Sequence, residues 1–308
     1  MSRNIFVTGG AGNLGASLVR ELIKDKNNDV VVADKFVTGS KSKLPVDGAD
    51  NLTIYEADAN SYEQLSKIMN NHAFDTIFHY AALVGVERTL KDPIGVLNDI
   101  DGIKAILDLS LEKKIKRVFF SSSSEVYGEP VEIPLNETTT PLNSRLPYAI
   151  VKNVGEAYFR SYGEVFGLDY TIMRFFNTYG PLQSDDFVIP RFVKRALNNE
   201  DIEINGDGLQ TRTFLHVEDN VRFITSILNE NTCINKTVNI GSADEISMIN
   251  LAKLIINITK SESKIVHKPA LEKGDMRRRK PDNSLMRELM PGDLISLEDG
   301  INRYIAEL

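Results

Sequence analysis

The chain has 308 residues, more than one compact core usually holds, so we expect a large domain and a smaller one with a ligand cleft between them. Its 42% apolar and 26% charged residues are ordinary for a globular protein, and no apolar run approaches the roughly 18 residues of a membrane helix. The net charge of −7 disfavours nucleic acid as a partner, and the single cysteine, Cys233, excludes an intrachain disulfide and a cysteine-based metal site.

The chain begins directly with strand and turn chemistry and lacks the pattern of a signal peptide, so we expect a cytoplasmic protein without a membrane segment or a bound metal. Short β-branched runs then alternate with segments of helical period, which is typical of a parallel sheet with crossover helices. The predicted strands are 4–8, 30–33, 52–57, 76–80, 117–121 and 170–175, and the predicted helices begin near 14 and span 94–113 and 148–166.

After Pro181 the pattern loosens into shorter elements that are interrupted by glycines and prolines. We therefore predict an α/β fold, a Rossmann-type doubly wound parallel sheet followed by a smaller α+β C-terminal domain. The predicted boundaries are 1–180 and 181–308, and we expect that some later segments return to the first domain.

A glycine loop follows the first predicted strand and opens the first helix, with Gly9, Gly12 and Gly15 spaced around Asn13 and Leu14. Gly9 permits a tight turn, Gly12 lets the backbone approach a pyrophosphate, and Gly15 allows the helix to pack closely on the strand. A ligand-free turn is the alternative. In this setting of strand, turn and helix, the loop predicts a dinucleotide site.

Carboxylates at the ends of the next two strands fit the adenosine half of that dinucleotide. Asp34 ends the second strand, where it can accept hydrogen bonds from a ribose and repels a 2′-phosphate, which favours NAD over NADP. Lys35 beside it weakens this preference, and an Asp that only caps a turn is the alternative. Asp58 and Ala59, after the third strand, are weaker candidates for adenine contacts.

Tyr148 and Lys152 are four residues apart on a predicted helix, so their side chains lie on one face. Lowering a tyrosine pKa from near 10 to about 7 takes roughly 4 kcal/mol, which a neighbouring ammonium and an oxidised nicotinamide ring can supply. Tyr148 could then accept a hydroxyl proton. Such a pair alone is usually structural, but here it follows a glycine loop and a serine-rich strand end that leads into Ser123, Ser124 and Glu125.

Taken together, these motifs resemble the extended short-chain dehydrogenase/reductase family, in particular its nucleotide-sugar epimerases, dehydratases and decarboxylases. The resemblance covers essentially the whole chain. The matching segments are 8–15, 79–82, 123–128, Tyr148 with Lys152, 174–181, 206–214 and Gly274-Asp275.

The resemblance implies a role for each matching residue. Tyr148 removes a proton from a sugar hydroxyl, usually at C4, Ser123 hydrogen-bonds the same oxygen, Lys152 holds the nicotinamide ribose, and hydride passes to tightly bound NAD. Ala81 and Ala82 line the cofactor. The other implied substrate contacts are Ser124, Asn177, Arg191, Arg212 and Arg278, and Glu125 is an additional catalytic candidate.

The net reaction stays open at this point. Dehydration is disfavoured because Ser124-Glu125 stands where 4,6-dehydratases have Asp-Glu, and a 4-epimerase needs no Glu125, which could instead orient a loop. We predict oxidation at C4 followed by hydride return, as in a 4-epimerase. The alternatives are a net C4 dehydrogenase of a nucleotide-linked hexose or heptose, a UDP-glucuronate decarboxylase, which shares the stretch 279–282, and an NAD-binding sensor or scaffold.

Two positions depart from the family pattern. Glu272 stands where UDP-galactose 4-epimerases have a diphosphate-binding arginine; Arg277, Arg278 or Arg279 could replace it, and Arg278 is our choice by register. Asp99 stands where the family often has asparagine near the nicotinamide. The family also implies a homodimer or larger homo-oligomer through helices 94–113 and 148–166, and a role in making a surface polysaccharide sugar.

Overall fold

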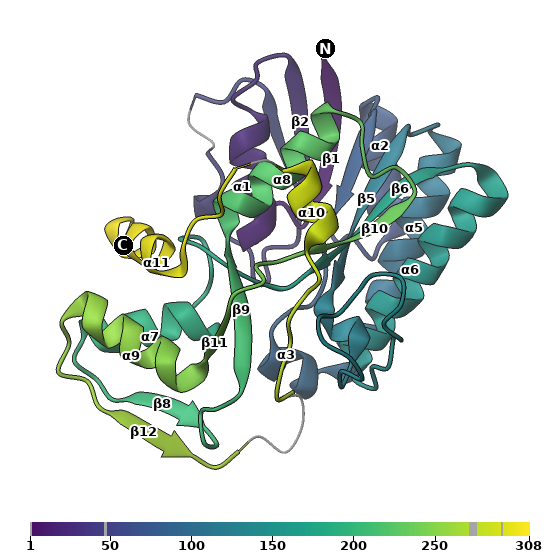
Figure 1. Cartoon of the computed structure of the whole chain (residues 1–308). Coiled ribbons are helices and arrows are strands. Elements are labelled where there is room, and N and C mark those ends of the chain that lie inside the picture. Colours follow the sequence, from purple (N-terminus) through teal and green to yellow (C-terminus); the bar gives the residue numbers. More distant parts are fainter. Residues whose placement is uncertain (1, 46–47, 271–275, 291) are drawn as a thin grey trace.

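The computed structural model describes residues 2–45, 48–270, 276–290 and 292–308, and Figure 1 shows its two unequal parts. The larger part is built on a seven-stranded sheet in the order β10-β6-β5-β4-β1-β2-β3, in which every neighbouring pair is parallel. Its strands are β1 (Arg3–Thr8), β2 (Asn28–Asp34), β3 (Leu52–Glu56), β4 (Thr76–His79), β5 (Arg117–Ser123), β6 (Asp169–Phe175) and β10 (Lys236–Ile240). The predicted Rossmann-type sheet is confirmed.

Helices cover both faces of this sheet, because its central strands are apolar on both sides. One face packs against α1 (Asn13–Leu22), α8 (Val217–Asn229) and α10 (Ser284–Leu289), and the other against α2 (Tyr62–Asn71), α5 (Asp99–Glu112) and α6 (Pro147–Phe166). The short segments η1 (Lys41–Lys43), α3 (Val86–Lys91), α4 (Pro93–Leu97) and η2 (Ser124–Tyr127) lie in the connections.

The predicted helix 94–113 is divided at Asn98 into α4 and α5. Asn98 keeps nearly helical dihedral angles, φ −65° and ψ −19°, so the two helices almost continue one another. The predicted helix 148–166 is α6, which begins with Pro147 in its first turn and ends at Gly167, whose φ of +71° closes the helix in the left-handed conformation.

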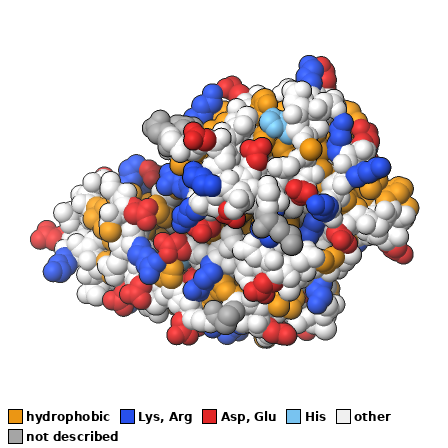
Figure 2. All heavy atoms as spheres, turned by 90° about the horizontal axis from the view of Figure 1, so that it is seen from above, with side chains coloured by type: hydrophobic (Ala, Val, Ile, Leu, Met, Phe, Trp, Pro, Cys, Tyr) orange, Lys and Arg blue, Asp and Glu red, His pale blue; other side chains and the backbone are white. Residues whose placement is uncertain are grey.

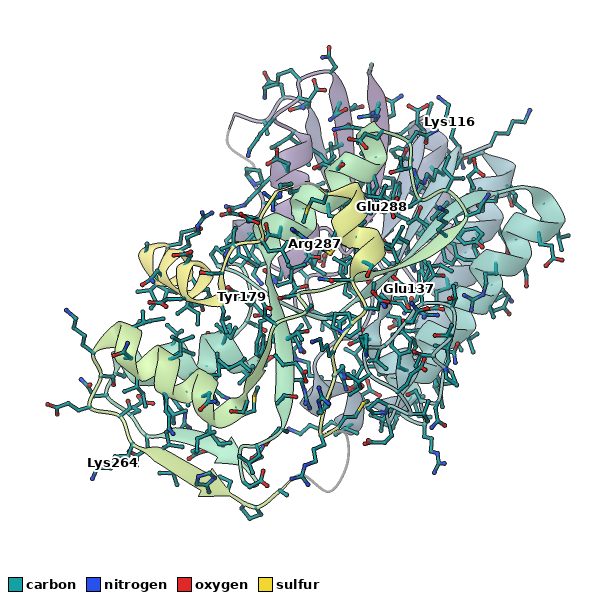
Figure 3. All side chains as sticks on the ribbon, in the orientation of Figure 1. Lys116, Glu137, Tyr179, Lys264, Arg287 and Glu288 are labelled. Carbon is teal, nitrogen blue, oxygen red and sulfur yellow. The ribbon has the colours of Figure 1, made fainter. Side chains whose placement is uncertain are left out.

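Among the described residues, the smaller part contains two short sheets and three helices. A three-stranded sheet has the order β11-β9-β7 and a two-stranded sheet pairs β12 with β8. The elements are β7 (Asn177–Tyr179), α7 (Val188–Leu197), β8 (Ile202–Asn205), β9 (Thr211–His216), β11 (Glu245–Ser247), α9 (Met248–Thr259), β12 (Ile265–Lys268) and α11 (Leu297–Ala306). Tyr179 lies where the two parts meet, whereas Lys116 and Lys264 project at opposite ends of the molecule (Figure 3).

The larger part also takes elements from beyond residue 180. β10 pairs with β6 at the edge of the large sheet, and α8 and α10 pack on α1 or on β10. The chain therefore leaves the first sheet after β6, builds part of the smaller unit, and returns. Acidic and basic side chains are interspersed on the face shown in Figure 2.

Candidate active site

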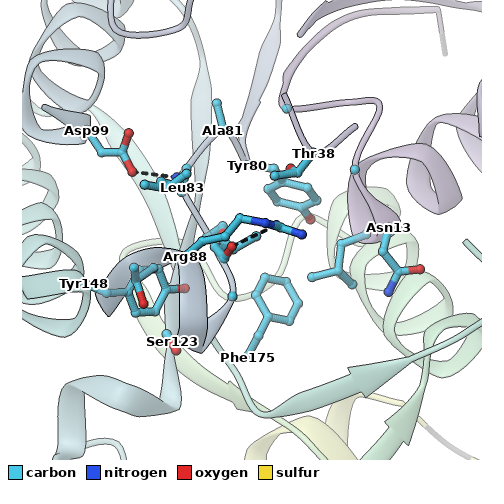
Figure 4. Close-up of a pocket in the computed structure, with 18 of the residues that line it drawn as sticks. Asn13, Thr38, Tyr80, Ala81, Leu83, Arg88, Asp99, Ser123, Tyr148 and Phe175 are labelled. Atoms are coloured by element: carbon cyan, nitrogen blue, oxygen red, sulfur yellow. Dashed lines mark hydrogen bonds between the residues drawn. The ribbon is translucent and has the colours of Figure 1, made fainter. Parts of the chain in front are cut away.

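A cavity of about 970 Å³ lies between the two parts. Its walls come from the carboxyl ends of β1, β2, β4 and β5, from the connections after them, and from β7 and the start of α7. The chain order of the sheet reverses between β1 and β4, which is where doubly wound folds bind dinucleotides. Figure 4 shows residues of the larger part around this space.

The glycine loop forms one end of the cavity. Gly9 has a φ of +69°, and a Cβ there would lie 2.5 Å from the amide nitrogen of Ala81. A Cβ on Gly15 would collide with the carbonyl oxygen of Gly9, so Gly15 permits the close approach of α1 to the strand. Gly12, the N-terminal cap of α1, differs because its Cβ would have only one neighbour, 3.4 Å away. The open space at Gly12 and the uncapped start of α1 fit a pyrophosphate.

Asp34 and Asp58 line the same half of the cavity. The Asp34 carboxylate accepts backbone hydrogen bonds from Ala11 at 2.8 Å and from Phe36 at 2.8 Å, which fixes its position beside the glycine loop. Asp58 accepts a 2.5 Å hydrogen bond from Lys35, the residue that weakens the preference for NAD in the sequence. Lys35 is therefore engaged with a carboxylate in this structure. Asn13, Leu14, Ala59, Ala81 and Ala82 also line the cavity.

Ser123, Tyr148 and Lys152 are brought together at the other end. Ser123 and Tyr148 both line the cavity there, and the Lys152 ammonium lies 5.8 Å from the centre of the Tyr148 ring. Burial lowers the pKa of Lys152 to about 8, while Asp99 acts in the opposite direction. Burial raises the pKa of Tyr148, and the neighbouring Ser123 side chain opposes that rise. Lys152 is buried beneath the cavity wall rather than part of it.

Asp99 is a further carboxylate in the wall near these residues. Its oxygens accept hydrogen bonds from the Leu83 amide at 2.8 Å and from the Asn60 side chain at 3.1 Å. Figure 4 shows the first of these bonds and places Asp99 on the same side of the cavity as Tyr148. The negative charge of Asp99 contributes to raising the pKa values of both Tyr148 and Lys152.

A buried polar cluster supports the strand end that carries Ser123. The Arg174 guanidinium binds both oxygens of Glu156, at 2.8 and 2.7 Å, and Ser122 donates a 2.6 Å hydrogen bond to the same carboxylate. Arg174 also donates to the Tyr127 hydroxyl at 2.8 Å. Arg174, the first residue of the matching segment 174–181, therefore links β5, α6 and β6, and does not line the cavity.

Glu125 and Arg279 form an ion pair in the cavity wall, with one guanidinium nitrogen 2.6 Å from Glu125 Oε1. The Arg279 side chain is only 6% exposed. Glu125 Oε2 and Arg279 Nε are both buried without a hydrogen-bond partner. The pair thus contains one acceptor atom and one donor atom that are buried and unpaired.

Three predicted arginines are not in the cavity wall. Arg278, our choice by register, is half exposed and pairs with Glu245 at 2.6 Å, whereas its neighbour Arg279 reaches the cavity. Arg212 donates to the carbonyl oxygens of Thr211 and Met276, and Arg191 is exposed on α7. Glu272, Gly274 and Asp275 lie outside the described residues.

Other predicted residues do reach the wall, and some wall residues were not predicted. Ser124 and Asn177 line the cavity, and Asn177 donates a 3.0 Å hydrogen bond to the Thr213 carbonyl. Arg279 and Arg88 were not chosen from the sequence. The stretch 279–282 contained the signal for Arg279, but no pattern distinguished Arg88 from a surface arginine.

Across residues 2–45, 48–270, 276–290 and 292–308, no group of His, Cys, Asp or Glu side chains could hold a metal ion. No helix within those residues is both long and apolar enough to span a membrane.

Residues 5–241 match the model of the NAD dependent epimerase/dehydratase family. The chain belongs to this family. It is 36% identical to the UDP-N-acetyl-alpha-D-glucosaminuronate decarboxylase of Bacillus cytotoxicus, over 99% of this chain and 97% of that protein. As the family model and these relatives imply, the chain is an NAD-dependent nucleotide-sugar enzyme and NAD is its cofactor.

Solved structures of family members resemble this one over nearly their whole length. The UDP-glucose 4-epimerase of Thermotoga maritima with UDP-glucose is 31% identical, with a TM-score of 0.92 over 99% of this chain and 98% of that one. The dTDP-glucose 4,6-dehydratase of Streptomyces venezuelae, solved with NAD, is 27% identical, with a TM-score of 0.91 over 99% and 96%. These three proteins have different names within one family, so the net reaction depends on particular site residues.

Proposed function

We propose that this enzyme decarboxylates a UDP-linked uronic acid, with oxidation at C4 preceding the loss of CO2. The observation that carries the proposal is the Glu125–Arg279 ion pair in the cavity wall. The reaction of a 4-epimerase requires no ion pair beside the sugar, whereas a uronic acid has a carboxylate that must be oriented. The similarity to the Bacillus cytotoxicus decarboxylase supports the same substrate class.

NAD would be held by the glycine loop and Lys152, and it would supply the hydride acceptor for the oxidation of C4. Tyr148 takes the proton of the C4 hydroxyl, and Ser123 donates a hydrogen bond to the same oxygen. Lys152 holds positive charge beneath the Tyr148 ring and favours the phenolate.

The C4 ketone makes the substrate a β-keto acid, whose bond from C5 to the carboxyl carbon breaks to release CO2. The electron pair of that bond moves into an enolate on the C4 oxygen, where Ser123 and the protonated Tyr148 stabilise the charge. Protonation at C5 gives a 4-keto pentose, and hydride return gives the UDP-pentose. The net change is uptake of one proton and loss of one CO2.

Arg279 and Glu125 act together on the substrate carboxylate in this proposal. Arg279 orients the carboxylate by its positive charge in the cavity wall, while Glu125 keeps the net charge of the pair at zero. An unpaired arginine in this dry site would bind the carboxylate too strongly and oppose its loss. The buried, unsatisfied Glu125 Oε2 also repels the carboxylate and not the neutral CO2.

The decisive experiment offers the purified enzyme UDP-glucuronate, UDP-N-acetylglucosaminuronate, UDP-glucose and UDP-N-acetylglucosamine. We expect one CO2 per uronate consumed, a UDP-pentose by mass spectrometry, and no lasting absorbance at 340 nm. Arg279→Gln and Glu125→Gln should abolish CO2 release, whereas Arg278→Gln, next to the pair but bonded to Glu245 outside the cavity, should not. NAD content and the unfolding midpoint verify that each variant is folded.

A 4-epimerase is the second candidate, and the full-length similarity to the Thermotoga maritima epimerase favours it. In that case the neutral sugars give C4 epimers and no uronate releases CO2. Accumulation of a 4-keto sugar with stoichiometric reduced cofactor would instead identify a net dehydrogenase. Either result would overturn the decarboxylase proposal.

We also propose a homodimer that uses α4 and α6. These helices pack together, yet Ile94, Leu97 and Ile150 on them are 68%, 39% and 41% exposed. Apolar side chains on adjacent helices are typical of a helical dimer interface. Light scattering should give twice the chain mass, and Ile94→Asp with Ile150→Asp should give a folded monomer. A monomeric wild-type chain contradicts this proposal.

A further inference from the structure

Arg88 lies in the wall of the cofactor cavity and has not been assigned a role above. It belongs to α3, in the connection between β4 and α4. In Figure 4 its side chain extends across the cavity from the side of Tyr148 toward the side of Asn13. This direction leads from the catalytic end to the glycine loop.

The guanidinium is held from two sides. One nitrogen donates a 3.2 Å hydrogen bond to the Val84 carbonyl, within the same connection. Another forms an ion pair with Asp186, which lies just before α7 in the smaller part of the molecule. Arg88 and Asp186 thus join the two parts beside the cavity, although their side chains are 34% and 52% exposed.

The positive charges near Arg88 favour binding of an anion. Lys43 also lines the cavity, where burial and then the charge of Arg88 lower its pKa, while Asp34 raises it. Two cations that repel each other across one space are both stabilised when a diphosphate enters it. The planar guanidinium also matches phosphate oxygens in a two-pronged hydrogen bond, which an ammonium cannot make.

We propose that Arg88 binds a pyrophosphate, and that Asp186 occupies its guanidinium when the pyrophosphate is absent. The favoured source is NAD, because the side chain extends toward the glycine loop; the nucleotide sugar carries the same group and is the other source. The proposal rests on NAD binding and is independent of decarboxylation. Asp186 is then a competitor of the ligand, and the exchange couples cofactor binding to contact between the two parts.

Because Asp186 competes with the ligand, substitutions of Arg88 and of Asp186 should change the affinity for NAD in opposite directions. Loss of the Arg88 charge in Arg88→Met should weaken binding of NAD by about tenfold, since a charge-assisted bond to phosphate is lost. Asp186→Asn should tighten binding of NAD by about two- to fivefold, since a partly exposed competing pair and a nearby negative charge are removed. A purely structural ion pair would make both variants weaker or leave both unchanged.

Calorimetric titration of NAD, and separately of UDP, into cofactor-stripped protein tests the proposal. Asp185→Asn is the matched control for Asp186→Asn, because Asp185 is its neighbour and pairs with Lys194. Lys91→Met removes a different cation from the same helix, one outside the cavity wall. Both controls should change either affinity less than twofold. If Arg88→Met does not fold, Arg88→Lys, with charge but no planar fork, should show an intermediate loss.

The outcomes separate the two sources of pyrophosphate. Weaker NAD binding by the Arg88 variant, with unchanged UDP binding, identifies the cofactor, and the reverse identifies the nucleotide sugar. Loss of less than twofold for both ligands would overturn the proposal, as would weaker binding by Asp186→Asn. Because CO2 release is not measured, failure here leaves the proposed reaction unaffected, and failure of that reaction leaves Arg88 unaffected.

Discussion

Lys152 shows how function and stability oppose each other at one residue. Lys152 is only 3% exposed, and no hydrogen bond or ion pair to its ammonium is found among the described residues. Of the neighbouring charges, Asp99 acts on its pKa. Burial therefore lowers its pKa from 10.5 to about 8. A buried charged lysine destabilises the fold in the NAD-free protein, but the same charge is what favours the Tyr148 phenolate.

Lys152→Met should therefore stabilise the NAD-free protein while abolishing turnover. Below pH 8 the folded chain carries the buried charge, so the gain in unfolding free energy is complete, on the order of 3 kcal/mol at pH 7. Between the folded pKa and 10.5 the unfolded chain binds more protons, so wild-type stability rises with pH and the gain falls to roughly 1.5 kcal/mol at pH 9.5.

Urea unfolding at both pH values measures this difference. The exposed Lys67→Met on α2 is the control and should change the free energy of unfolding by less than about 0.5 kcal/mol at either pH. A Lys152→Met protein that is less stable than wild type at pH 7 would show that packing around the ammonium outweighs its desolvation.

At the scale of elements, the turn between β1 and α1 contains one glycine that the fold requires and another that ligand binding requires. Gly15→Ala places a methyl group against the Gly9 carbonyl and 2.8 Å from Gly10 Cα, so it should cost about 1–3 kcal/mol of stability. Gly12 has a φ of −76°, which alanine adopts readily. Gly12→Ala should fold normally, with the methyl group in the space intended for the pyrophosphate.

Thermal unfolding with and without NAD distinguishes the two variants. Gly12→Ala should keep the wild-type midpoint without ligand and lose most of the NAD-dependent increase, since stabilisation by a ligand follows its affinity. Gly15→Ala should have a lower midpoint under both conditions. Equal NAD stabilisation of Gly12→Ala and wild type would place the pyrophosphate elsewhere.

Local sequence patterns predicted these elements because each pattern depends on interactions between residues that are close in the sequence. The β-branched runs gave all six predicted strands to within two residues, and the spacing of Tyr148 and Lys152 placed both on α6. Which of two adjacent arginines in a loop faces the cavity cannot be predicted in this way, because both have the same chemistry. Arg278 and Arg279 could be told apart only once the backbone directed one toward Glu245 and the other toward Glu125.

At the scale of the whole molecule, the two parts in Figure 1 do not correspond to two consecutive halves of the chain. Val238 and Ile240 of β10 are fully buried, and Phe223 and Ile227 of α8 belong to the same core as Leu18 of α1. Sequence periodicity predicted α1 but neither α8 nor β10, and it does not predict pairing, since a strand does not record which neighbour it joins. The return of β10 to the sheet depends on contacts distant in sequence.

A fragment that ends at residue 183 should therefore not fold alone. It lacks β10, which leaves the edge of β6 open, and α8, which leaves the apolar face of α1 exposed to water. We expect an aggregated product, or a soluble one without a cooperative unfolding transition and without NAD binding. Adding the fragment 184–308 during refolding supplies both missing elements and should restore NAD binding. A fragment 1–183 that binds NAD with wild-type affinity would show that the first six strands and their helices are a self-sufficient cofactor domain.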